Sequence, residues 1–267
     1  MQNIHVAFPG GRFKALTLSY DDGRASDRRL VSILNGAGLK GSFHLNAGLL
    51  GQGERLPASE IRSLYEGHEV AAHSLTHPTL ARCPREQVAR QILDDRAALE
   101  DIVGYPVRGF SYPNGSLSAE IAELLPLVGV EYARCVQTTG GFGLPEDFLR
   151  WQGTCHHRQD LAARGREFLE LAKSQYLYLM YVWGHSYEFD NNGNWEIIED
   201  FARALGGRDD IWYATNIEIV DYWKRWKATR FSSGCSLAQN PSALPVWLSV
   251  GGQVVEVPGG ATVALPG

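Results

Sequence analysis

The stretch LTLSYDDG, residues 16–23, ends an apolar strand on two adjacent carboxylates and a glycine. The run from Leu16 to Leu18 has the apolar and β-branched character that favours a strand. Side chains alternate between the two faces of a strand, so Asp21 and Asp22 should point apart. Their charges repel unless a cation or a proton lies between them. Because Asp-Gly is also a common turn signal, this motif taken alone is more often a solvated turn than a functional site.

Strand-like and helix-like segments alternate on both sides of this motif. Strands are predicted at 15–20, 40–46, 68–74, 107–113, 131–137, 176–184 and 210–215, and helices at 26–37, 85–103, 118–125, 164–174, 195–205 and 218–227. Repeated β-then-α units indicate an α/β protein with a parallel sheet and helices outside it. Seven strands in this space favour a (β/α) barrel, and a doubly wound sheet is the alternative.

The tail of the chain has a different pattern. From residue 229 onward, apolar residues alternate around Gly-Gly turns, which is typical of a small β-hairpin or meander. We therefore predict a barrel domain over residues 1–228 and a small β-rich extension over residues 229–267. The extension is expected to pack as an edge that caps the barrel, with sugar binding or oligomerisation as alternative roles.

Charge and composition exclude some partner classes. The chain has 267 residues, a net charge of −5, no long basic run and no apolar run of membrane-span length, so nucleic acid and membrane are not expected partners. Residues 1–5 lack the basic and apolar regions of a signal peptide. We expect a cytoplasmic protein, or a secreted one if a leader precedes this sequence. The four cysteines are scattered and could form two disulfides, but a chain this long does not need them, so we expect reduced thiols. None forms a CxxC pair, so a cysteine zinc site is not expected.

Several residues that can carry chemistry follow predicted strand ends. These are the Asp21-Asp22 pair, His73, Tyr112 and His185, and active-site residues gather at such ends in both candidate folds. In HSLTH, His73 lies four residues before His77, so both imidazoles would share one face if this stretch is helical. Two histidines and one carboxylate suit a catalytic zinc. A divalent cation would also offset the repulsion between the two aspartates.

The motifs SYDDG, HSLTH, RGFSYPNG and a late strand ending in histidine occur in this order along the chain. In this order they resemble the polysaccharide deacetylases, the NodB-homology enzymes of carbohydrate esterase family four, over roughly residues 14–226. The resemblance implies a distorted (β/α) barrel of about seven strands. It also implies metal-dependent removal of acetyl groups, mostly N-acetyl groups of amino sugars in an acetylated carbohydrate.

Matched residue by residue, the resemblance implies that Asp22, His73 and His77 bind one divalent metal ion. Zinc is the expected ion, and cobalt, nickel or iron also accept this ligand set. Water bound to that metal would attack the amide carbonyl.

The remaining catalytic roles implied by the resemblance fall on four residues. Asp21 would act as the base and His185 as the acid. Arg108 would hold Asp21, and the backbone N–H of Tyr112 would stabilise the oxyanion.

The sequence departs from the family pattern around the acid. The aspartate-tryptophan motif that orients the acid histidine is missing from RWQGTCHH, residues 150–157. Glu188, Asp190 or an acid from a distant segment could orient His185 instead. The residues that we expect to contact substrate are Trp151, Trp183, Tyr187, His156 and His157, although core packing explains any one of the aromatic side chains equally well.

Three rival interpretations remain open. The chain could be an O-acetyl esterase on the same scaffold, another barrel metallohydrolase, or a barrel that binds glycan without turnover. An ester needs less help at its leaving group, so the missing partner of His185 slightly favours the esterase. The complete set of candidate site residues argues against a non-catalytic barrel.

Overall fold

The computed structural model describes residues 3–267, so the first two residues of the segment considered for a leader lie outside the description. Its centre is a sheet in which every strand pairs parallel to its neighbours. The main path runs β7-β6-β5-β4-β3-β2-β9-β8, and β10 pairs with the first half of β2. The strands are β2 (Lys14–Asp21), β3 (Gly41–Leu45), β4 (Glu69–Ala72), β5 (Gly109–Ser111), β6 (Tyr132–Thr138), β7 (Trp151–Gly153), β8 (Cys155–His156), β9 (Tyr178–Gly184) and β10 (Ile211–Tyr213).

The two ends of this path meet, so the sheet curls into a nearly closed barrel. β7 and β8 are consecutive in the chain and are joined by Thr154, whose N–H donates to the carbonyl of Tyr181 in β9 at 2.7 Å. The prediction of a distorted (β/α) barrel is confirmed, and the doubly wound alternative is excluded by this closure.

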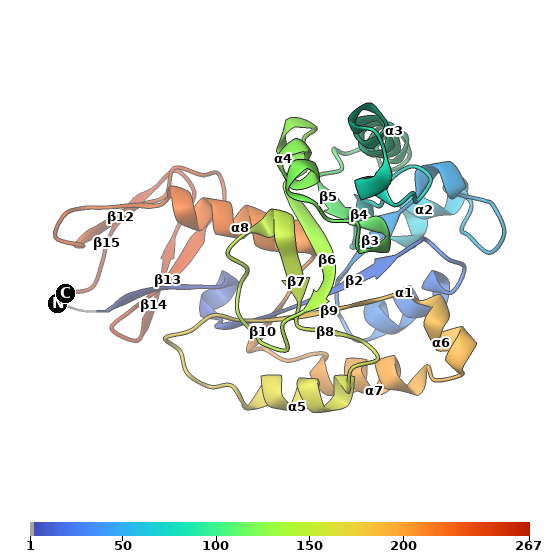
Figure 1. Cartoon of the computed structure of the whole chain (residues 1–267). Helices are drawn as coiled ribbons and strands as arrows, with labels where there is room; N and C mark the ends of the chain where they lie inside the picture. The colour runs from blue at the N-terminus through green and yellow to red at the C-terminus, as the bar shows by residue number, and fades with distance from the viewer. Residues whose placement is uncertain (1–2) are drawn as a thin grey trace.

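Helices surround the barrel (Figure 1). They are α1 (Asp27–Gly36), α2 (Ala58–Leu64), α3 (Arg85–Val103), α4 (Ala119–Leu127), α5 (Leu161–Glu170), α6 (Tyr187–Asn192), α7 (Glu196–Leu205) and α8 (Asn216–Ala228). Helix α5 begins three residues before the predicted 164–174 because Asp160 caps it, accepting the N–H of Ala163 at 3.1 Å. The short helices α2 and α6 and the short strands β7 and β8 were not predicted.

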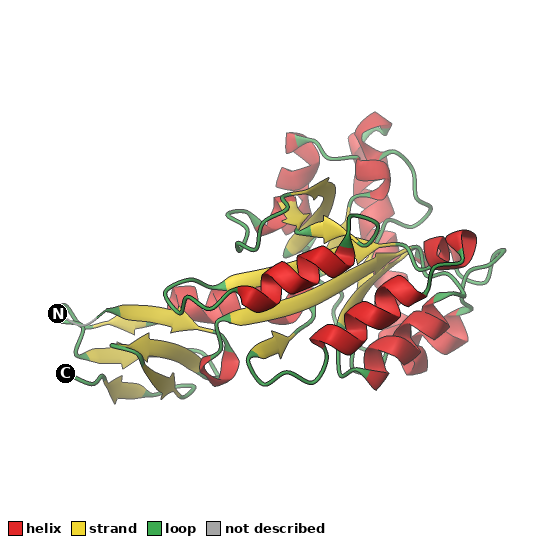
Figure 2. Ribbon diagram, turned by 90° about the horizontal axis from the view of Figure 1, so that it is seen from below, coloured by secondary structure: helices red, strands yellow, loops and turns green. Residues whose placement is uncertain are grey.

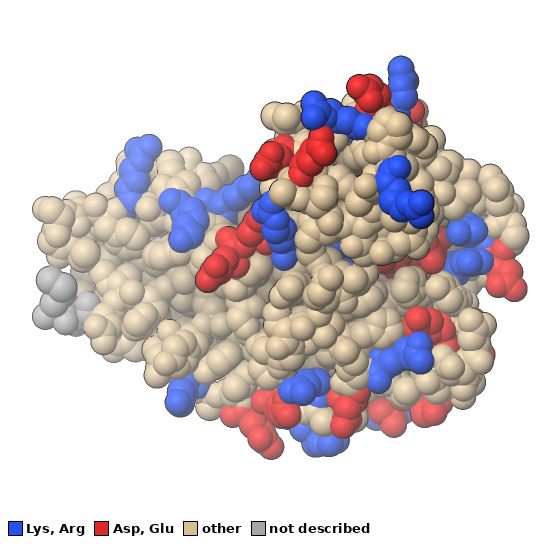
Figure 3. All heavy atoms as spheres, in the orientation of Figure 1, with Lys and Arg blue, Asp and Glu red and all other residues tan. Residues whose placement is uncertain are grey.

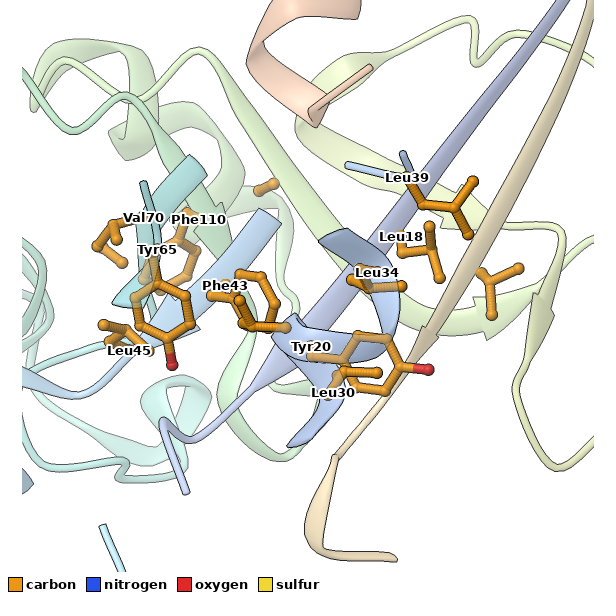
Figure 4. Packing of buried hydrophobic residues seen from close by; sticks show 14 of the residues in the cluster. Leu18, Tyr20, Leu30, Leu34, Leu39, Phe43, Leu45, Tyr65, Val70 and Phe110 are labelled. Atoms are coloured by element: carbon orange, nitrogen blue, oxygen red, sulfur yellow. The ribbon is translucent and has the colours of Figure 1, made fainter. Parts of the chain in front are cut away.

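The core lies between the sheet and the helices. Figure 4 shows Leu30 and Leu34 of α1 beside Leu18 and Tyr20 of β2, and all four side chains are buried. Burying a side chain of this size contributes about 1.5–3 kcal/mol. The spacing of the apolar residues in α1 follows the helical period, which fixes that helix on the outside of β2.

The strands of the predicted extension belong to two small antiparallel sheets. One has the order β11-β12-β15, with β11 (Arg230–Phe231), β12 (Leu237–Gln239) and β15 (Thr262–Ala264). The other has the order β1-β13-β14, with β1 (Ile4–Ala7), β13 (Val246–Val250) and β14 (Gln253–Val257). The start of the chain therefore joins the extension, and both ends of the chain lie on that side (Figure 2).

Within the described residues, the charged surface seen in Figure 3 and the cysteines show no feature that marks a binding site. On the face drawn in Figure 3, side chains of both charges are intermixed. No helix within residues 3–267 has the length and apolarity to cross a membrane. The four cysteines are free thiols, of which Cys135 and Cys155 are buried.

Candidate active site

The strand ends bring the predicted residues together. Asp21 is the last residue of β2, His73 follows β4, Ser111 ends β5 and His185 follows β9. All four strands are parallel, so these side chains share the carboxyl-terminal mouth of the barrel.

Asp22, His73 and His77 form a compact trio of potential metal ligands. The Oδ1 atom of Asp22 lies 4.0 Å from Nε2 of His73 and 3.8 Å from Nε2 of His77. Asp22 and His77 have positive φ angles of 79° and 59°. Such angles are uncommon for residues other than glycine and concentrate at functional sites, where the surroundings hold the strain.

The conditional expectation of a helix through the two histidines is wrong. Residues 73–79 form a loop after β4, in which Ser74 and His77 both adopt left-handed backbone. Asn46 holds this loop by donating its side-chain amide to the carbonyls of His73 and Ser74 at 2.6 and 2.8 Å. The loop, and not a helical repeat of four, therefore brings the two imidazoles together.

His73 has the protonation state that a metal ligand needs. Its Nδ1 lies 2.9 Å from the carbonyl oxygen of Ser111, an acceptor, so Nδ1 carries the proton and Nε2 keeps a free lone pair. Burial lowers the pKa of His73 to about 4, against the opposing effect of Asp21, so the ring is neutral near pH 7. The donor set of this trio fits a divalent cation.

Asp21 is buried and held by an arginine other than the predicted one. Arg134 of β6 forms an ion pair with its Oδ2, and the Oγ of Ser111 donates to Oδ1 at 3.2 Å. His44 lies 3.4 Å from Oδ1. Burial alone would raise the pKa of Asp21, but the Arg134 guanidinium and the nearby histidines hold it well below its usual range. Asp21 is therefore an ionised carboxylate.

The prediction that Arg108 holds Asp21 is wrong. Arg108 precedes β5 and points to the outside of the barrel. There it donates to both carboxylate oxygens of Asp221 at 2.8 Å and to Glu131 at 3.0 Å. Arg134 sits inside the barrel instead, with its guanidinium 4.2 Å above the ring of Trp183.

Replacing Arg134 by methionine should destabilise the protein by about 3–5 kcal/mol, because the buried Asp21 charge would lose its partner. Arg108→Met is the matched control. Its ion pairs are partly exposed, so its loss should cost about 1 kcal/mol or less. Urea unfolding of both variants measures the difference, and equal losses would contradict the assignment of Arg134.

The predicted oxyanion role of Tyr112 is also contradicted. Its backbone N–H donates to the carbonyl of Arg134 at 3.1 Å, continuing the β5–β6 ladder, and so cannot also bind an oxyanion. Its hydroxyl donates to the carbonyl of Leu149 at 2.7 Å. Tyr112 is a buried structural residue that links β5 to the segment before β7.

His185 has a carboxylate neighbour in Glu188 of α6. The Nδ1 of His185 lies 3.4 Å from Oε1 of Glu188. Burial lowers the pKa of His185, but Glu188 and the charges of Asp21 and Asp22 outweigh it, so the net pKa is raised. Asp190, the other acid considered, accepts instead from Ser26 and from Trp195 at 2.5 and 2.9 Å.

His156 and His157 meet the same glutamate. Oε2 of Glu188 lies 3.3 Å from Nε2 of His156 and 2.9 Å from Nε2 of His157, so these three residues also form a potential ligand cluster. Nδ1 of His156, however, accepts the backbone N–H of Arg158 at 3.2 Å. A neutral ring with this bond carries its proton on Nε2, which then cannot ligate a metal. The cluster is better explained as two imidazoles that hold Glu188.

The expected substrate contacts divide into three groups. Trp151 and His157 are 1% and 2% exposed and cannot reach a sugar. Trp183 is buried beneath Arg134 and packs edge-on against His156 at 4.5 Å. Tyr187 and His156 are half-buried near the mouth, and the Tyr187 ring centre lies 5.3 Å from that of His185.

Residues 10–133 match the polysaccharide deacetylase family. The resemblance drawn from the motifs is thereby confirmed. Two bacterial cell-wall deacetylases are similar over part of this region. The peptidoglycan-N-acetylglucosamine deacetylase of Listeria monocytogenes is 29% identical over 122 residues, 45% of this chain and 26% of its own. The peptidoglycan-N-acetylmuramic acid deacetylase of Bacillus subtilis is 32% identical over 111 residues, 40% and 23% of the two chains.

Solved structures support the fold of the deacetylase family over more of the chain. A putative polysaccharide deacetylase from Mycobacterium smegmatis superimposes with a TM-score of 0.63 at 17% identity, covering 85% of this chain and 96% of its own. A family 4 carbohydrate esterase from Streptomyces lividans gives 0.52 at 17% identity, covering 76% and 93%. By contrast, the matched region spans about a quarter of the length of the two curated deacetylases.

Two residues of the candidate site were missed by sequence reasoning. Arg134 is a charged residue inside the apolar strand EYARCVQ, and a buried charge on a strand is a signal of a partner. His44 alternates inward in KGSFHLN and contacts Asp21 from β3. Both could have been found by asking which polar residues face the inside of the barrel.

Proposed function

We propose that this protein is a metal-dependent hydrolase that removes N-acetyl groups from the amino sugars of a glycan. The observation that carries the proposal is the pair of adjacent aspartates with different surroundings. Asp22 faces the imidazoles of His73 and His77. Asp21 also lies 3.4 Å from His44 and 3.7 Å from His73, but its carboxylate is bound by Arg134 and Ser111. One carboxylate is thus available to a cation, and its neighbour remains free to accept a proton.

Asp22, His73 and His77 would hold the cation. When bound, a divalent ion polarises the acetyl carbonyl and lowers the pKa of the attacking water. Asp21 takes the proton of that water on its carboxylate, and Arg134 keeps this carboxylate ionised and fixed in orientation. Attack on the carbonyl carbon and cleavage of the carbon–nitrogen bond then release acetate and a free amine.

The departing amine needs a proton, and His185 is placed to donate it. An amide nitrogen is a very poor leaving group, so a general acid contributes substantially to its cleavage. Glu188 raises the pKa of His185 and supports the charged imidazolium. An ester would need this proton far less, so the His185–Glu188 contact favours the amide over the O-acetyl ester.

Glu188→Gln should move the alkaline limb of the pH–rate profile to lower pH. The charged form of His185 is the active one, so activity falls as pH rises through its pKa, and removing the glutamate charge lowers that pKa. The matched control is Asp190→Asn, an acid of the same helix that bonds Ser26 and Trp195. An unchanged alkaline limb in Glu188→Gln would show that His185 does not set it.

An acetate-release screen of the metal-loaded protein tests the proposal. The substrates are N-acetylglucosamine oligomers, peptidoglycan and acetylated xylan. Release from an N-acetylated glycan is expected, together with its loss after chelation and its return with added metal. Release from xylan alone would make the protein an O-acetyl esterase, and binding without release would make it a non-catalytic barrel.

A further inference from the structure

We propose that Arg24 and Arg55 form a binding site for an anionic substituent on the sugar substrate, beside the metal trio. This inference rests on the proposed function for its choice of sugar. The two arginines come from different loops, one directly after the Asp21-Asp22 motif and the other before α2. The two residues are far apart in the sequence, and the fold brings them opposite each other.

The backbone places the two side chains on one face. Arg24 and Arg55 form an isolated antiparallel bridge, closed by Ala25 N–H to the carbonyl of Glu54 at 2.8 Å and Leu56 N–H to the carbonyl of Gly23 at 2.9 Å. In this arrangement the two arginines are a non-hydrogen-bonded pair, in which opposing side chains approach most closely. Like charges directly opposite each other are destabilising.

No carboxylate relieves this repulsion. Within residues 3–267, neither guanidinium has an ion pair or a hydrogen bond to another side chain, and Nε of each is buried without a partner. The contrast with the neighbouring Arg28 is clear, since Arg28 makes a two-pronged contact with Glu60 at 2.8 and 3.0 Å. In a chain of net charge −5, leaving two opposed cations without partners favours an outside anion.

Arg24, one member of the pair, lies close to the reacting groups. Arg24 is two residues after Asp22, and the central carbon of its guanidinium lies 5.1 Å from the ring centre of Tyr187. Tyr187 in turn packs against His185. An anion held here would sit at the rim of the site, where a substituent of the bound sugar could reach it.

The chemistry of the pair selects the class of ligand. A guanidinium offers parallel N–H donors that match the two oxygens of a carboxylate or a phosphate. An N-acetylated sugar that carries either group could place its acetyl group at the trio and its anion on the arginines. A neutral N-acetylated sugar would gain nothing from this pair.

Three sugars distinguish the sources of charge. N-Acetylglucosamine is neutral, N-acetylmuramic acid adds a carboxylate, and N-acetylglucosamine 6-phosphate adds a phosphate. Their affinities would be measured by NMR titration of the metal-loaded chain carrying Asp21→Asn, which slows turnover. We expect at least one acidic sugar to bind about tenfold tighter than the neutral one, the usual worth of a charge-assisted contact.

The arginine variants complete the test. Arg24→Gln and Arg55→Gln should each remove most of this preference and leave the affinity for N-acetylglucosamine unchanged. Arg24→Lys should restore only part of it because the fork is lost. Arg28→Gln, which breaks an exposed ion pair nearby, is the control and should keep the preference.

Equal affinities for all three sugars would overturn the proposal, as would a preference that survives the double Arg24→Gln, Arg55→Gln variant. Failure here and failure of the proposed function are distinguishable. Acetate release can fail while the binding preference remains, and the preference can be absent from an active deacetylase.

Discussion

Asp21→Asn should lower acetate release by roughly 10²-fold or more, the usual worth of a general base, while the metal content stays unchanged. Asparagine keeps the shape of the side chain but cannot accept the proton of the attacking water. The metal content is expected to persist because Asp21 pairs with Arg134, and Asp22 is the carboxylate that faces the two histidines. Initial rates and metal analysis on the same preparation measure both quantities.

Asp27→Asn is the matched control for this variant. Asp27 is also buried close to the aspartate pair, and burial raises its pKa to about 7, so the wild-type side chain is already partly neutral there. Its carboxylate accepts the hydroxyl of Tyr65 at 2.6 Å, which an asparagine oxygen can still do. Joint loss of metal and activity in Asp21→Asn would reverse the assignment of the two aspartates.

His77→Ala should remove most of the bound metal and with it the metal-dependent activity. A site with three protein ligands loses one of them, and the remaining Asp22 and His73 hold a cation much more weakly. His77 is the most exposed of the three side chains, at 26%, so its replacement leaves little buried space behind. The expected readout is a steep fall in metal per chain after dialysis, with unchanged thermal unfolding of the metal-free protein.

His68→Gln is the control, because it removes a buried imidazole that lies away from the trio. His68 accepts the N–H of Gly41 at 3.0 Å and contacts Asn35, away from the trio. Metal content should be unchanged in that variant. Full metal occupancy in His77→Ala would refute the trio as the binding site.

The sequence predicted most of the barrel because its long elements have clear periodicity. Strand β2 and helix α3 carry patterns of two and 3.6 residues over many positions, and the structure places both within one residue of the expected bounds. Helix α6 has six residues, and strand β8 has two. Segments this short contain no full period, so a pattern cannot identify them.

The candidate metal ligands could be predicted from the sequence, whereas Arg134, the partner of Asp21, could not. Asp22, His73 and His77 lie in motifs that are local in the chain. The partner of Asp21 depends instead on which side chain of a distant strand faces the barrel interior. Arg108 precedes β5 and Arg134 lies within the adjacent strand β6, so only the side of the barrel wall to which each side chain points separates them. The predicted oxyanion role of Tyr112 was wrong for a similar reason, since its backbone N–H is used in the pairing of β5 with β6.

The pairing of β1 with β13 joins the N-terminal segment to the C-terminal extension in one cooperative unit. Ile4–Ala7 lies beside Val250–Trp247, and the Tyr222 hydroxyl of α8 bridges the Ala7 carbonyl and the Trp247 N–H. Cutting the chain after Ala228 would leave β1 as an open strand edge and strip this hydroxyl of one partner. The extension is thus not a detachable module. Its loss would expose a strand edge, and exposed edges of this kind promote aggregation.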